Sequence, residues 1–343
     1  MKLLITGGAG FIGSNFIQHI LKERGDVQVV NLDLLSYAGN LDNLADVFRD
    51  SRYTFLHGDI AESRDVEACL NSHQIDIIVN FAAETHVDRS IVDSSAFVRT
   101  NLQGTQILLE AARRKKIGRF VQISTDEVYG SLGPTGKFSE QSPLAPNSPY
   151  AASKAGADLM VQAYHHTYGI HVNVTRCSNN YGPFQFPEKL IPLMTLNALE
   201  DMSLPVYGDG LYTRDWIHVK DHCRAVERVV FDGRPGQTYN IGGNQEKRNL
   251  DVVHRILDIL GKSRELIQFV DDRPGHDRRY AIDASRIGRE LNWSPQISFE
   301  DGLAETIRWY RQNPDWVKRV RSGAYLDFYR EMYEDRRRML SEL

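Results

Sequence analysis

The sequence predicts an α/β protein in which a doubly wound parallel sheet is joined to a smaller mixed α/β lobe toward the C-terminus. Short apolar segments alternate with longer amphipathic segments through the first half of the chain. Such alternation is typical of a parallel sheet covered by helices on both faces. A glycine-rich loop directly follows the first apolar segment, and prolines interrupt shorter elements in the second half. Together these observations indicate one large sheet domain and one lobe.

In the first half, each predicted strand is a short segment rich in β-branched and aliphatic residues. The predicted strands are residues 3–6, 27–32, 53–56, 75–81, 119–124 and 172–176. The segments between them carry apolar residues at helical spacing, and Ser63 and Ser94 are suitable N-caps. The predicted helices are residues 14–22, 63–72, 94–115 and 153–168.

In the second half, helices are predicted over residues 250–260 and 299–312. A helix at 221–231 and a strand at 238–241 are expected to return to the first domain. The chain is therefore expected to divide into a sheet domain of residues 1–178 with 217–243, and a lobe of residues 179–216 and 244–343. The charged segment 329–338 is expected to be a solvated helical face.

Composition narrows the possible functions. Of 343 residues, 41% are hydrophobic and 25% are charged, close to the averages of globular proteins. The net charge of −4 is spread without basic blocks, which argues against a nucleic acid or an anionic membrane surface as partner. The N-terminal segment leaves no room for a signal peptide, and no apolar run reaches the roughly 18 residues of a membrane helix. A cytoplasmic location is therefore expected.

The three cysteines, Cys69, Cys177 and Cys223, are far apart and lack the spacing of a zinc site or a redox pair. They are expected to be reduced, buried and inert. No metal site is expected.

The loop after the first strand has the pattern of a dinucleotide-binding turn. Gly7, Gly8, Gly10 and Gly13 satisfy both G-x-x-G-x-x-G and G-x-G-x-x-G. Such glycines allow a tight turn, a close approach of the backbone to a pyrophosphate, and close helix packing. Asp33 ends the second predicted strand about 20 residues later, where a carboxylate accepts ribose hydroxyls and repels a 2′-phosphate. The sequence therefore predicts a Rossmann-type domain that binds NAD in preference to NADP.

Two later strand ends extend this cofactor site. Asp59 and Ile60 end the third strand, where they either flank the adenine or serve a structural role, with little to separate the two. Ala82 and Ala83 follow the fourth strand, and their small side chains let a cofactor pass close by.

Tyr150 and Lys154 form a Tyr-x-x-x-Lys pair, which places both side chains on one helical face. A free tyrosine titrates near pH 10, so a neighbouring ammonium and a positive nicotinamide are needed to make it a usable base. Lys154 can also hold the nicotinamide ribose. Alone the pair usually means a surface contact, but the glycine loop and the Ser-Thr strand end favour a catalytic role.

The segment Ser124-Thr125-Asp126-Glu127 ends the fifth predicted strand. Thr125 is expected to donate a hydrogen bond to the sugar oxygen that Tyr150 deprotonates, while Ser124 shares this role or is only a buried strand-end hydroxyl. Two acidic residues alone would be explained as exposed loop carboxylates. Near Tyr150 and Lys154, however, the two acidic residues match the acid and base that an elimination of water requires.

Oxidation of a hexose at C4 to a ketone acidifies the C5 proton. Glu127 is therefore expected to abstract this proton while Asp126 protonates the departing C6 hydroxyl. The hydride then returns to C6. For Asp126 to be protonated near neutral pH, its pKa must rise by roughly 3 units, at a cost of about 4 kcal/mol. Burial and the charge of Glu127 are the available causes.

These residues resemble the extended short-chain dehydrogenase/reductase superfamily and, within it, the dTDP-glucose 4,6-dehydratases. The similarity covers nearly the whole chain, and only the Thr-Asp-Glu run distinguishes dehydratases from epimerases and decarboxylases. The motifs are the glycine loop, 37–41 (YAGNL), 82–90 (AAETHVDRS), 125–130 (TDEVYG), Tyr150 with Lys154, 176–183 (RCSNNYGP) and 272–276 (DRPGH).

The resemblance implies the catalytic roles given above for Thr125, Asp126, Glu127, Tyr150 and Lys154. It implies NAD contacts, beyond Gly7, Gly10 and Gly13, at Phe11, Ile12, Asp33, Ser36, Asp59, Ile60, Ala82, Ala83, Thr100 and Asn180. It implies substrate contacts at Thr85, Asn179, Lys189, Leu190, Pro205, Tyr207, Arg214, Asn249, Arg273 and His276. Leu34 stands where relatives often have lysine, a departure that concerns one cofactor contact and leaves the cofactor itself unchanged.

Arg214 and Arg273 are suited to clamp a diphosphate, because planar guanidinium groups match phosphate oxygens. The alternative for each is an ion pair with a nearby aspartate, namely Asp215, Asp272 or Asp277. His86 and His276 could equally be structural histidines, and His86 is not predicted to be catalytic.

Other functions remain open at this point. A nucleotide-sugar 4-epimerase, a UDP-sugar dehydratase, a UDP-glucuronate decarboxylase and a plain NAD-dependent reductase share the fold, although an epimerase, a decarboxylase or a reductase does not need both acids. A non-catalytic nucleotide-sugar sensor would not need the catalytic set at all. The helices at 94–115 and 153–168 could pair with a second copy as a four-helix bundle, as the resemblance implies, so a homodimer is expected.

Overall fold

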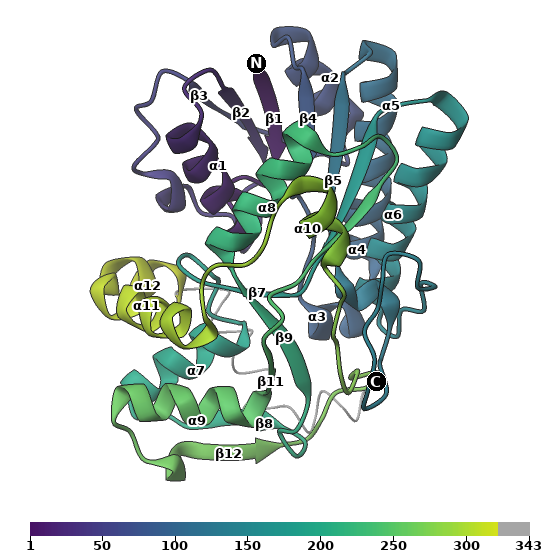
Figure 1. Ribbon diagram of the computed structural model, residues 1–343. Helices are drawn as coiled ribbons and strands as arrows, with labels where there is room; N and C mark the ends of the chain where they lie inside the picture. The colour runs from purple at the N-terminus through teal and green to yellow at the C-terminus, as the bar shows by residue number, and fades with distance from the viewer. Residues whose placement is uncertain (322–343) are drawn as a thin grey trace.

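A seven-stranded parallel sheet forms the larger part of the computed structural model, which describes residues 1–321 (Figure 1). The strand order is β10-β6-β5-β4-β1-β2-β3, and each neighbouring pair is parallel. The strands are β1 (Lys2–Thr6), β2 (Gln28–Asp33), β3 (Tyr53–His57), β4 (Ile77–Asn80), β5 (Arg119–Thr125), β6 (Val172–Cys177) and β10 (Thr238–Ile241). The predicted doubly wound sheet is confirmed. The charged segment 329–338 lies outside the described residues.

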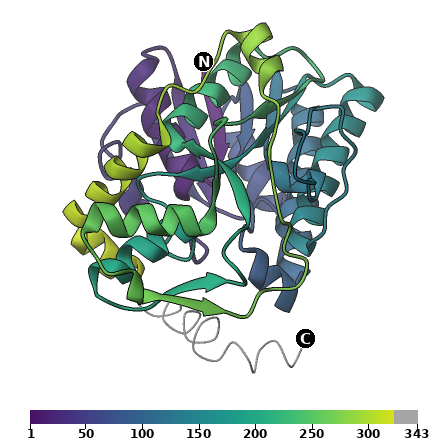
Figure 2. The same ribbon diagram turned by 60° about the horizontal axis from the view of Figure 1, so that its bottom comes forward.

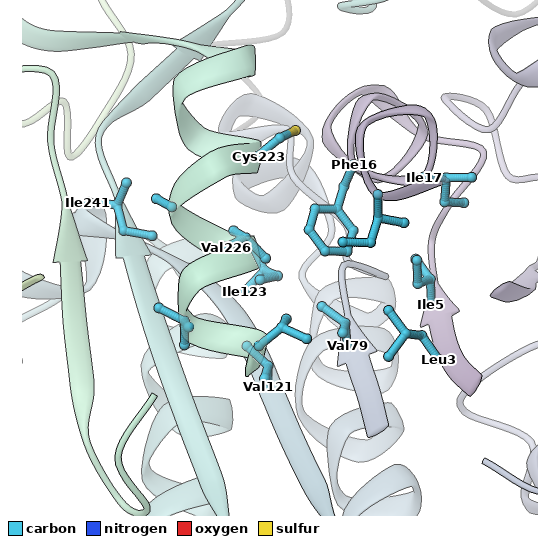
Figure 3. Packing of buried hydrophobic residues seen from close by; sticks show 14 of the residues in the cluster. Leu3, Ile5, Phe16, Ile17, Val79, Val121, Ile123, Cys223, Val226 and Ile241 are labelled. Atoms are coloured by element: carbon cyan, nitrogen blue, oxygen red, sulfur yellow. The ribbon is translucent and has the colours of Figure 1, made fainter. Parts of the chain in front are cut away.

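Helices cover both faces of this sheet, as the sequence predicts. One layer holds α1 (Phe11–Glu23), α8 (Val219–Asp232) and α10 (Ser285–Leu291); the other holds α2 (Ser63–Ser72), α5 (Thr105–Lys115) and α6 (Pro149–Tyr168). Strand residues alternate between the two layers: Leu3 and Ile5 belong to the first apolar cluster and Leu4 to the second. Figure 3 shows Phe16 of α1 and Val226 of α8 pointing toward the strands.

The lobe lies beyond the carboxyl ends of these strands (Figures 1 and 2). A three-stranded sheet has the order β11-β9-β7, and β8 pairs in parallel with β12. Its strands are β7 (Asn179–Tyr181), β8 (Leu204–Tyr207), β9 (Thr213–His218), β11 (Glu246–Arg248) and β12 (Ile267–Val270). Its helices are α7 (Leu190–Leu199), α9 (Asn249–Leu260), α11 (Phe299–Gln312) and α12 (Pro314–Val320). Within residues 1–321, no helix combines the length and apolar character that crossing a bilayer demands.

Several predicted helix boundaries differ from the structure. Helix α6 begins at Pro149, four residues before the predicted start, because the Ser148 hydroxyl accepts a hydrogen bond from the Ala151 N–H at 3.1 Å. Ser63 is the first residue of α2 and not its N-cap, which is Glu62. Ser94 occupies an N-cap position, but its side chain makes no capping hydrogen bond.

The predicted helix over 94–115 is helical but not one regular helix. It contains α4 (Ser95–Phe97), a π-helix (Val98–Gly104) and then α5. The sequence did not predict the short helix α3 (Val87–Val92), α7, α10 or α12. Three short 3-10 helices complete the described chain, at Leu41–Leu44, Asp126–Tyr129 and Arg264–Leu266.

Candidate active site

The glycine loop brings the start of α1 close to the end of β4. Gly7 has a φ of +69°, and a Cβ atom there would lie 2.6 Å from the Cα of Ala82. A Cβ atom on Gly13 would lie 2.3 Å from the Gly7 carbonyl oxygen. The N-cap of α1 is Gly10, which has no side chain to occupy the free N–H groups of the first turn. The loop is therefore shaped to hold an anion such as a pyrophosphate.

Asp33 lies at the carboxyl end of β2, next to this loop. Its carboxylate accepts hydrogen bonds from the backbone N–H groups of Ala9 and Leu35, both at 2.8 Å. Burial raises the pKa of Asp33, and the two backbone hydrogen bonds oppose that rise. Because each carboxylate oxygen has two lone pairs, Asp33 can still accept from a ribose hydroxyl.

Asp59 is held in a more structural way. Its carboxylate accepts from the Ala61 N–H at 2.8 Å and from the Arg99 guanidinium at 2.6 Å. Both carboxylate oxygens thus have protein partners, although Asp59 also lines the cleft described next. The structural interpretation of Asp59 is thus supported, and its contact with the adenine stays a prediction.

One cleft, with about 300 Å³ of open volume, runs along the carboxyl ends of the strands. Every residue predicted to contact NAD lines it: Gly7, Gly10, Phe11, Ile12, Gly13, Asp33, Ser36, Asp59, Ile60, Ala82, Ala83, Thr100, Tyr150, Lys154 and Asn180. Ser124, Thr125, Asp126 and Glu127 line the same cleft. Residues from six strand ends are thus brought to one place, as expected at the carboxyl edge of a doubly wound sheet.

Tyr150 and Lys154 enter this cleft from the first turns of α6. The Lys154 ammonium donates a hydrogen bond to the Ile123 carbonyl at 2.7 Å. Burial lowers the pKa of Lys154 and raises the pKa of Tyr150 well above its ordinary value. The charge of Glu127 raises the pKa of Tyr150 further, whereas a hydrogen bond with Thr125 lowers it. Burial therefore favours the protonated phenol, and its deprotonation depends on positive charge nearby.

Thr125, Asp126 and Glu127 are fixed by the turn that follows β5. Thr125 is the N-cap of the 3-10 helix Asp126–Tyr129, and its hydroxyl accepts from the Glu127 N–H at 3.2 Å. The same hydroxyl lies 3.4 Å from Asp126 Oδ1. The turn directs both acidic side chains into the cleft and does not leave them on an exposed loop.

Asp126 and Glu127 lie in different electrostatic surroundings. Burial raises the pKa of Asp126 well above its ordinary value, and the carboxylates of Glu127 and Asp215 increase this rise. Burial also raises the pKa of Glu127 above its ordinary value, but three cations limit that rise. These cations are Arg273, Arg214 and Lys189. The surroundings therefore favour a proton on Asp126 more strongly than on Glu127.

Of the residues predicted to contact substrate, Thr85, Asn179 and Lys189 line the cleft. The others come from the lobe: Leu190 begins α7, Pro205 and Tyr207 lie on β8, Arg214 on β9, Asn249 begins α9, and Arg273 and His276 follow β12. The charges of Arg214 and Arg273 lower the pKa of Glu127, so these two residues of the lobe act on the same part of the cleft.

Neither arginine makes the ion pair that the sequence left open. Arg214 donates to the backbone carbonyls of Thr213 and Asp277, both at 2.9 Å. Arg273 lies 3.1 Å from the carboxylate of Asp88, a residue on α3 to which the sequence assigned no role. The Tyr207 hydroxyl donates to the same carboxylate at 2.8 Å. Asp88 therefore positions two predicted substrate residues at once.

The ring of His276 packs against another aromatic ring and is not available as a base. Its ring stacks on Tyr212 with centroids 3.8 Å apart, and its Nδ1 lies 2.7 Å from Asp272. Burial lowers the pKa of His276 to about 3, so the imidazole is neutral. His86 accepts from the Arg89 N–H at 3.4 Å and caps α3.

Several buried polar atoms around the centre have no hydrogen-bond partner within the described residues. They are Ser124 Oγ, Asp126 Oδ2, Asn179 Oδ1, Asn180 Oδ1, Asn249 Oδ1 and Arg273 Nε. Buried polar groups are normally satisfied, so this set marks positions that a polar ligand would complete. Such a ligand would extend from the glycine loop toward the lobe.

Known proteins are similar to this chain over nearly its whole length. A family model described as GDP-mannose 4,6 dehydratase matches residues 4–306. The dTDP-glucose 4,6-dehydratase of Shigella flexneri is 51% identical, over 98% of this chain and 100% of its own length. The dTDP-glucose 4,6-dehydratase of Xanthomonas campestris pv. campestris (strain B100) is 53% identical, over 94% of this chain and 96% of its own length.

Solved structures with the same fold include two enzyme classes. DesIV, a dTDP-glucose 4,6-dehydratase of Streptomyces venezuelae crystallised with NAD, is 52% identical with a TM-score of 0.90, covering 93% of this chain and 100% of that one. A UDP-glucose 4-epimerase of Thermotoga maritima has a TM-score of 0.85 at 27% identity, covering 92% and 100%. The two classes are similar in fold, whereas sequence identity is much higher toward the dehydratase.

Proposed function

The chain belongs to the family described as GDP-mannose 4,6 dehydratase, and on this premise we propose that it is an NAD-dependent dTDP-glucose 4,6-dehydratase. It is a hydro-lyase that oxidises dTDP-glucose at C4, removes water across C5 and C6, and returns the hydride to C6. The product is dTDP-4-keto-6-deoxy-glucose. The observation that carries this proposal is the pair Asp126 and Glu127, set in one cleft with Tyr150 and Lys154.

The cofactor is NAD, which when bound takes the hydride from C4 and later delivers it to C6. The residues present fit this group. A Cβ atom at Gly7 or Gly13 would collide with the backbone of Ala82 or Gly7, so the glycines keep the loop tight, and the first turn of α1 offers uncapped N–H groups. Asp33 is placed for the adenosine ribose and would repel a 2′-phosphate.

Tyr150 removes the proton of the C4 hydroxyl. Its raised pKa makes this step depend on positive charge beside the phenol, which Lys154 and the oxidised cofactor supply. Lys154 holds the nicotinamide ribose, and Thr125 donates a hydrogen bond to the C4 oxygen. Ser124, whose buried hydroxyl has no partner within the described residues, shares this contact or only supports the strand end.

Glu127 removes the C5 proton once C4 is a ketone, and Asp126 protonates the leaving C6 hydroxyl. The three cations near Glu127 limit the rise of its pKa and so support the ionised form that acts as the base. Burial and two neighbouring carboxylates keep Asp126 protonated and able to act as the acid. An epimerase or a simple reductase has no step that needs this acid and base.

Arg214 and Arg273 bind the substrate diphosphate. The guanidinium of Arg214 donates its hydrogen bonds to neutral carbonyls. Within the described residues, no carboxylate forms a direct ion pair with it. The remaining sugar and nucleoside contacts are assigned to Thr85, Asn179, Lys189, Leu190, Pro205, Tyr207, Asn249 and His276.

One incubation tests this function. We expect dTDP-glucose deuterated at C4, supplied in ordinary water, to give a product with deuterium at C6, a solvent proton at C5 and no net NADH. Deuterium retained at C4 of a galactose product would instead indicate an epimerase, and absence of turnover would indicate a sensor or a substrate with a different base or sugar. In the Glu127→Gln variant we expect NAD binding to persist, exchange at C5 to disappear and kcat to fall about 10²–10⁴-fold.

Three broader assignments belong to the same proposal. The chain divides into an NAD-binding domain of residues 1–178 with 217–243, and a nucleotide-sugar lobe of residues 179–216 and 244–343. It acts in the cytoplasm. It forms a homodimer through the helices around α5 and α6, where Val98 and Leu159 are 50% and 60% exposed.

A further inference from the structure

Two segments that are distant in sequence meet beside the cofactor cleft. Residues 34–40 follow β2 of the main sheet, and residues 182–189 lead from β7 into α7 of the lobe. Ser36, Ala38 and Gly39 of the first segment and Phe186 and Glu188 of the second all line the cleft. The hydroxyl of Tyr37 donates a hydrogen bond to Glu188 Oε1 at 3.0 Å, across 151 positions of sequence.

The contact is more than one hydrogen bond. The Tyr37 ring meets the ring of Phe186 edge-on, with centroids 5.6 Å apart and an interplanar angle of 87°. On Tyr37, the Arg89 guanidinium lies 4.1 Å from the ring centroid. Such edge-on and cation–π contacts add to the burial of the ring. Tyr37 is therefore held on two sides as well as at its hydroxyl.

Glu188 is an unusual acceptor for a cleft wall. Its side chain is only 1% exposed, and its nearest cations, Arg89 and Lys189, are 3.9 and 4.0 Å away. A buried carboxylate needs close hydrogen bonds, and the Tyr37 hydroxyl supplies one. Burial and the charge of Glu188 raise the pKa of Tyr37 well above its ordinary value, so the phenol keeps the proton that it donates.

Both segments are attached next to the start of α1. The Asn40 N–H donates to the Ala9 carbonyl at 3.0 Å, and the Asn15 amide donates to the Pro183 carbonyl at 3.0 Å. The Lys189 ammonium donates to the Thr85 carbonyl at 2.8 Å. The Tyr37–Glu188 bond therefore joins two anchored segments beside the uncapped helix end that would hold the pyrophosphate.

We propose that Tyr37 and Glu188 form a clasp that retains NAD in the cleft from one turnover to the next. The inference rests on the proposed function, in which the hydride taken from C4 is returned to C6. Because the cofactor ends each cycle as it began, its release serves no step. Loss of the reduced cofactor in mid-cycle would leave the sugar oxidised at C4 with no hydride for C6. Slow release of the cofactor is therefore useful to this reaction.

The test measures NAD release directly. The holoenzyme is loaded with radiolabelled NAD, mixed with excess unlabelled NAD, and the label retained on protein is followed with time. We expect Tyr37→Phe, which removes only the hydroxyl, to release NAD about tenfold faster, the effect of losing one hydrogen bond to a charged group. Glu188→Gln, which alters the clasp from its other side, should also release NAD faster than the unaltered protein.

Tyr239→Phe is the matched control, because Tyr239 donates a bond of the same kind to Glu290 at 3.1 Å, outside the cleft lining. It should leave the release rate unchanged. Release from Tyr37→Phe and Glu188→Gln at the rate of the unaltered protein, with unfolding midpoints also unchanged, would overturn the clasp. An unaltered protein that binds no NAD would instead overturn the proposed function.

Discussion

At the scale of the residue, the chemistry depends on two neighbouring acids that the fold treats differently. Asp126 has Glu127 and Asp215 as its principal charged neighbours, with Arg214 opposing them. Glu127 has Arg273, Arg214 and Lys189. The sequence places both acids at the end of β5, but the charges that separate their roles come from β9 and from the segments before α7 and after β12. Under the proposed function, these surroundings would make one of the two adjacent carboxylates the acid and the other the base.

The raised pKa of Asp126 has a consequence for stability. Between the unfolded pKa and the higher folded pKa, the folded state binds the extra proton, so the free energy of unfolding decreases as pH rises through this window. Asp126→Asn cannot ionise and escapes this loss. We expect the variant to lose about 10²–10⁴-fold in kcat and yet to unfold at most about 2–4 °C higher than the unaltered protein at pH 8.

Thermal unfolding of both proteins at pH 5 and pH 8 checks this sign. The advantage of Asp126→Asn should grow from the lower to the higher pH. A constant difference, or an advantage that is larger at pH 5, would mean that Asp126 is not held protonated by the folded protein.

The local motifs of the site could be predicted from sequence because their parts are close in the chain. The glycine loop, Asp33, the Thr125–Glu127 run and the Tyr150–Lys154 pair all line one cleft. Contacts between distant residues could not be predicted. Asp88 meets Arg273 across 185 positions and Tyr37 meets Glu188 across 151. Each of these contacts joins single side chains, and a single side chain carries no periodic pattern in the sequence that would reveal its partner.

At the scale of the element, the π-helix explains how one helix serves the cofactor site. Asn101, inside Val98–Gly104, accepts from the Glu84 N–H at 2.9 Å and donates to the Glu84 carbonyl at 3.0 Å. It also donates to the Ser153 hydroxyl of α6 at 2.8 Å. A π-helix is commonly found at functional sites, and here its Asn101 amide contacts both the loop after β4 and α6.

We therefore expect Asn101→Ala to lower the free energy of unfolding by about 2–4 kcal/mol and to weaken NAD binding, because it leaves buried partners unsatisfied on both elements. Chemical denaturation and NAD titration measure the two effects. Asn173→Ala is the control, since Asn173 is equally buried and donates to the carbonyls of Arg234 and Gln237. It should destabilise the protein without changing the affinity for NAD. An unchanged affinity in Asn101→Ala would remove the cofactor role.

The elements themselves were predicted where periodicity is strong. The six strands and the helix Phe299–Gln312 follow from apolar spacing, and the strand predicted at 238–241 pairs with β6. The sequence missed the π-helix because it interrupts a pattern that an ordinary helix also satisfies. It missed the first turn of α6 because Ser148 and Pro149 follow a proline-rich loop, where a cap is easily taken for a turn.

At the scale of the whole molecule, the lobe and the sheet domain share the site. Strand β10 returns to the edge of the main sheet beside β6, and α8 packs with α1 in one apolar cluster. Strand β9, which carries Arg214, leads directly from the lobe into α8. The substrate would therefore be held by parts of the chain that are distant in sequence and meet at the cleft.

Exposed apolar residues on α6 and on the π-helix support the proposed dimer. Leu159 on α6 is 60% exposed and Val98 on the neighbouring π-helix is 50% exposed, although both are apolar. The two elements are in contact, because a Cβ atom on Gly156 would lie 3.4 Å from the side chain of Leu102. We expect Leu159→Arg to place a charge in the helix-bundle interface and to reduce the mass in solution to the 39.1 kDa of one chain, measured by light scattering after size exclusion. Phe269→Arg, at a 56% exposed position on β12 of the lobe, should remain dimeric. If both variants keep the mass of the unaltered protein, the subunits do not associate through this face, and if the unaltered chain is already monomeric, the exposed apolar residues serve no such contact.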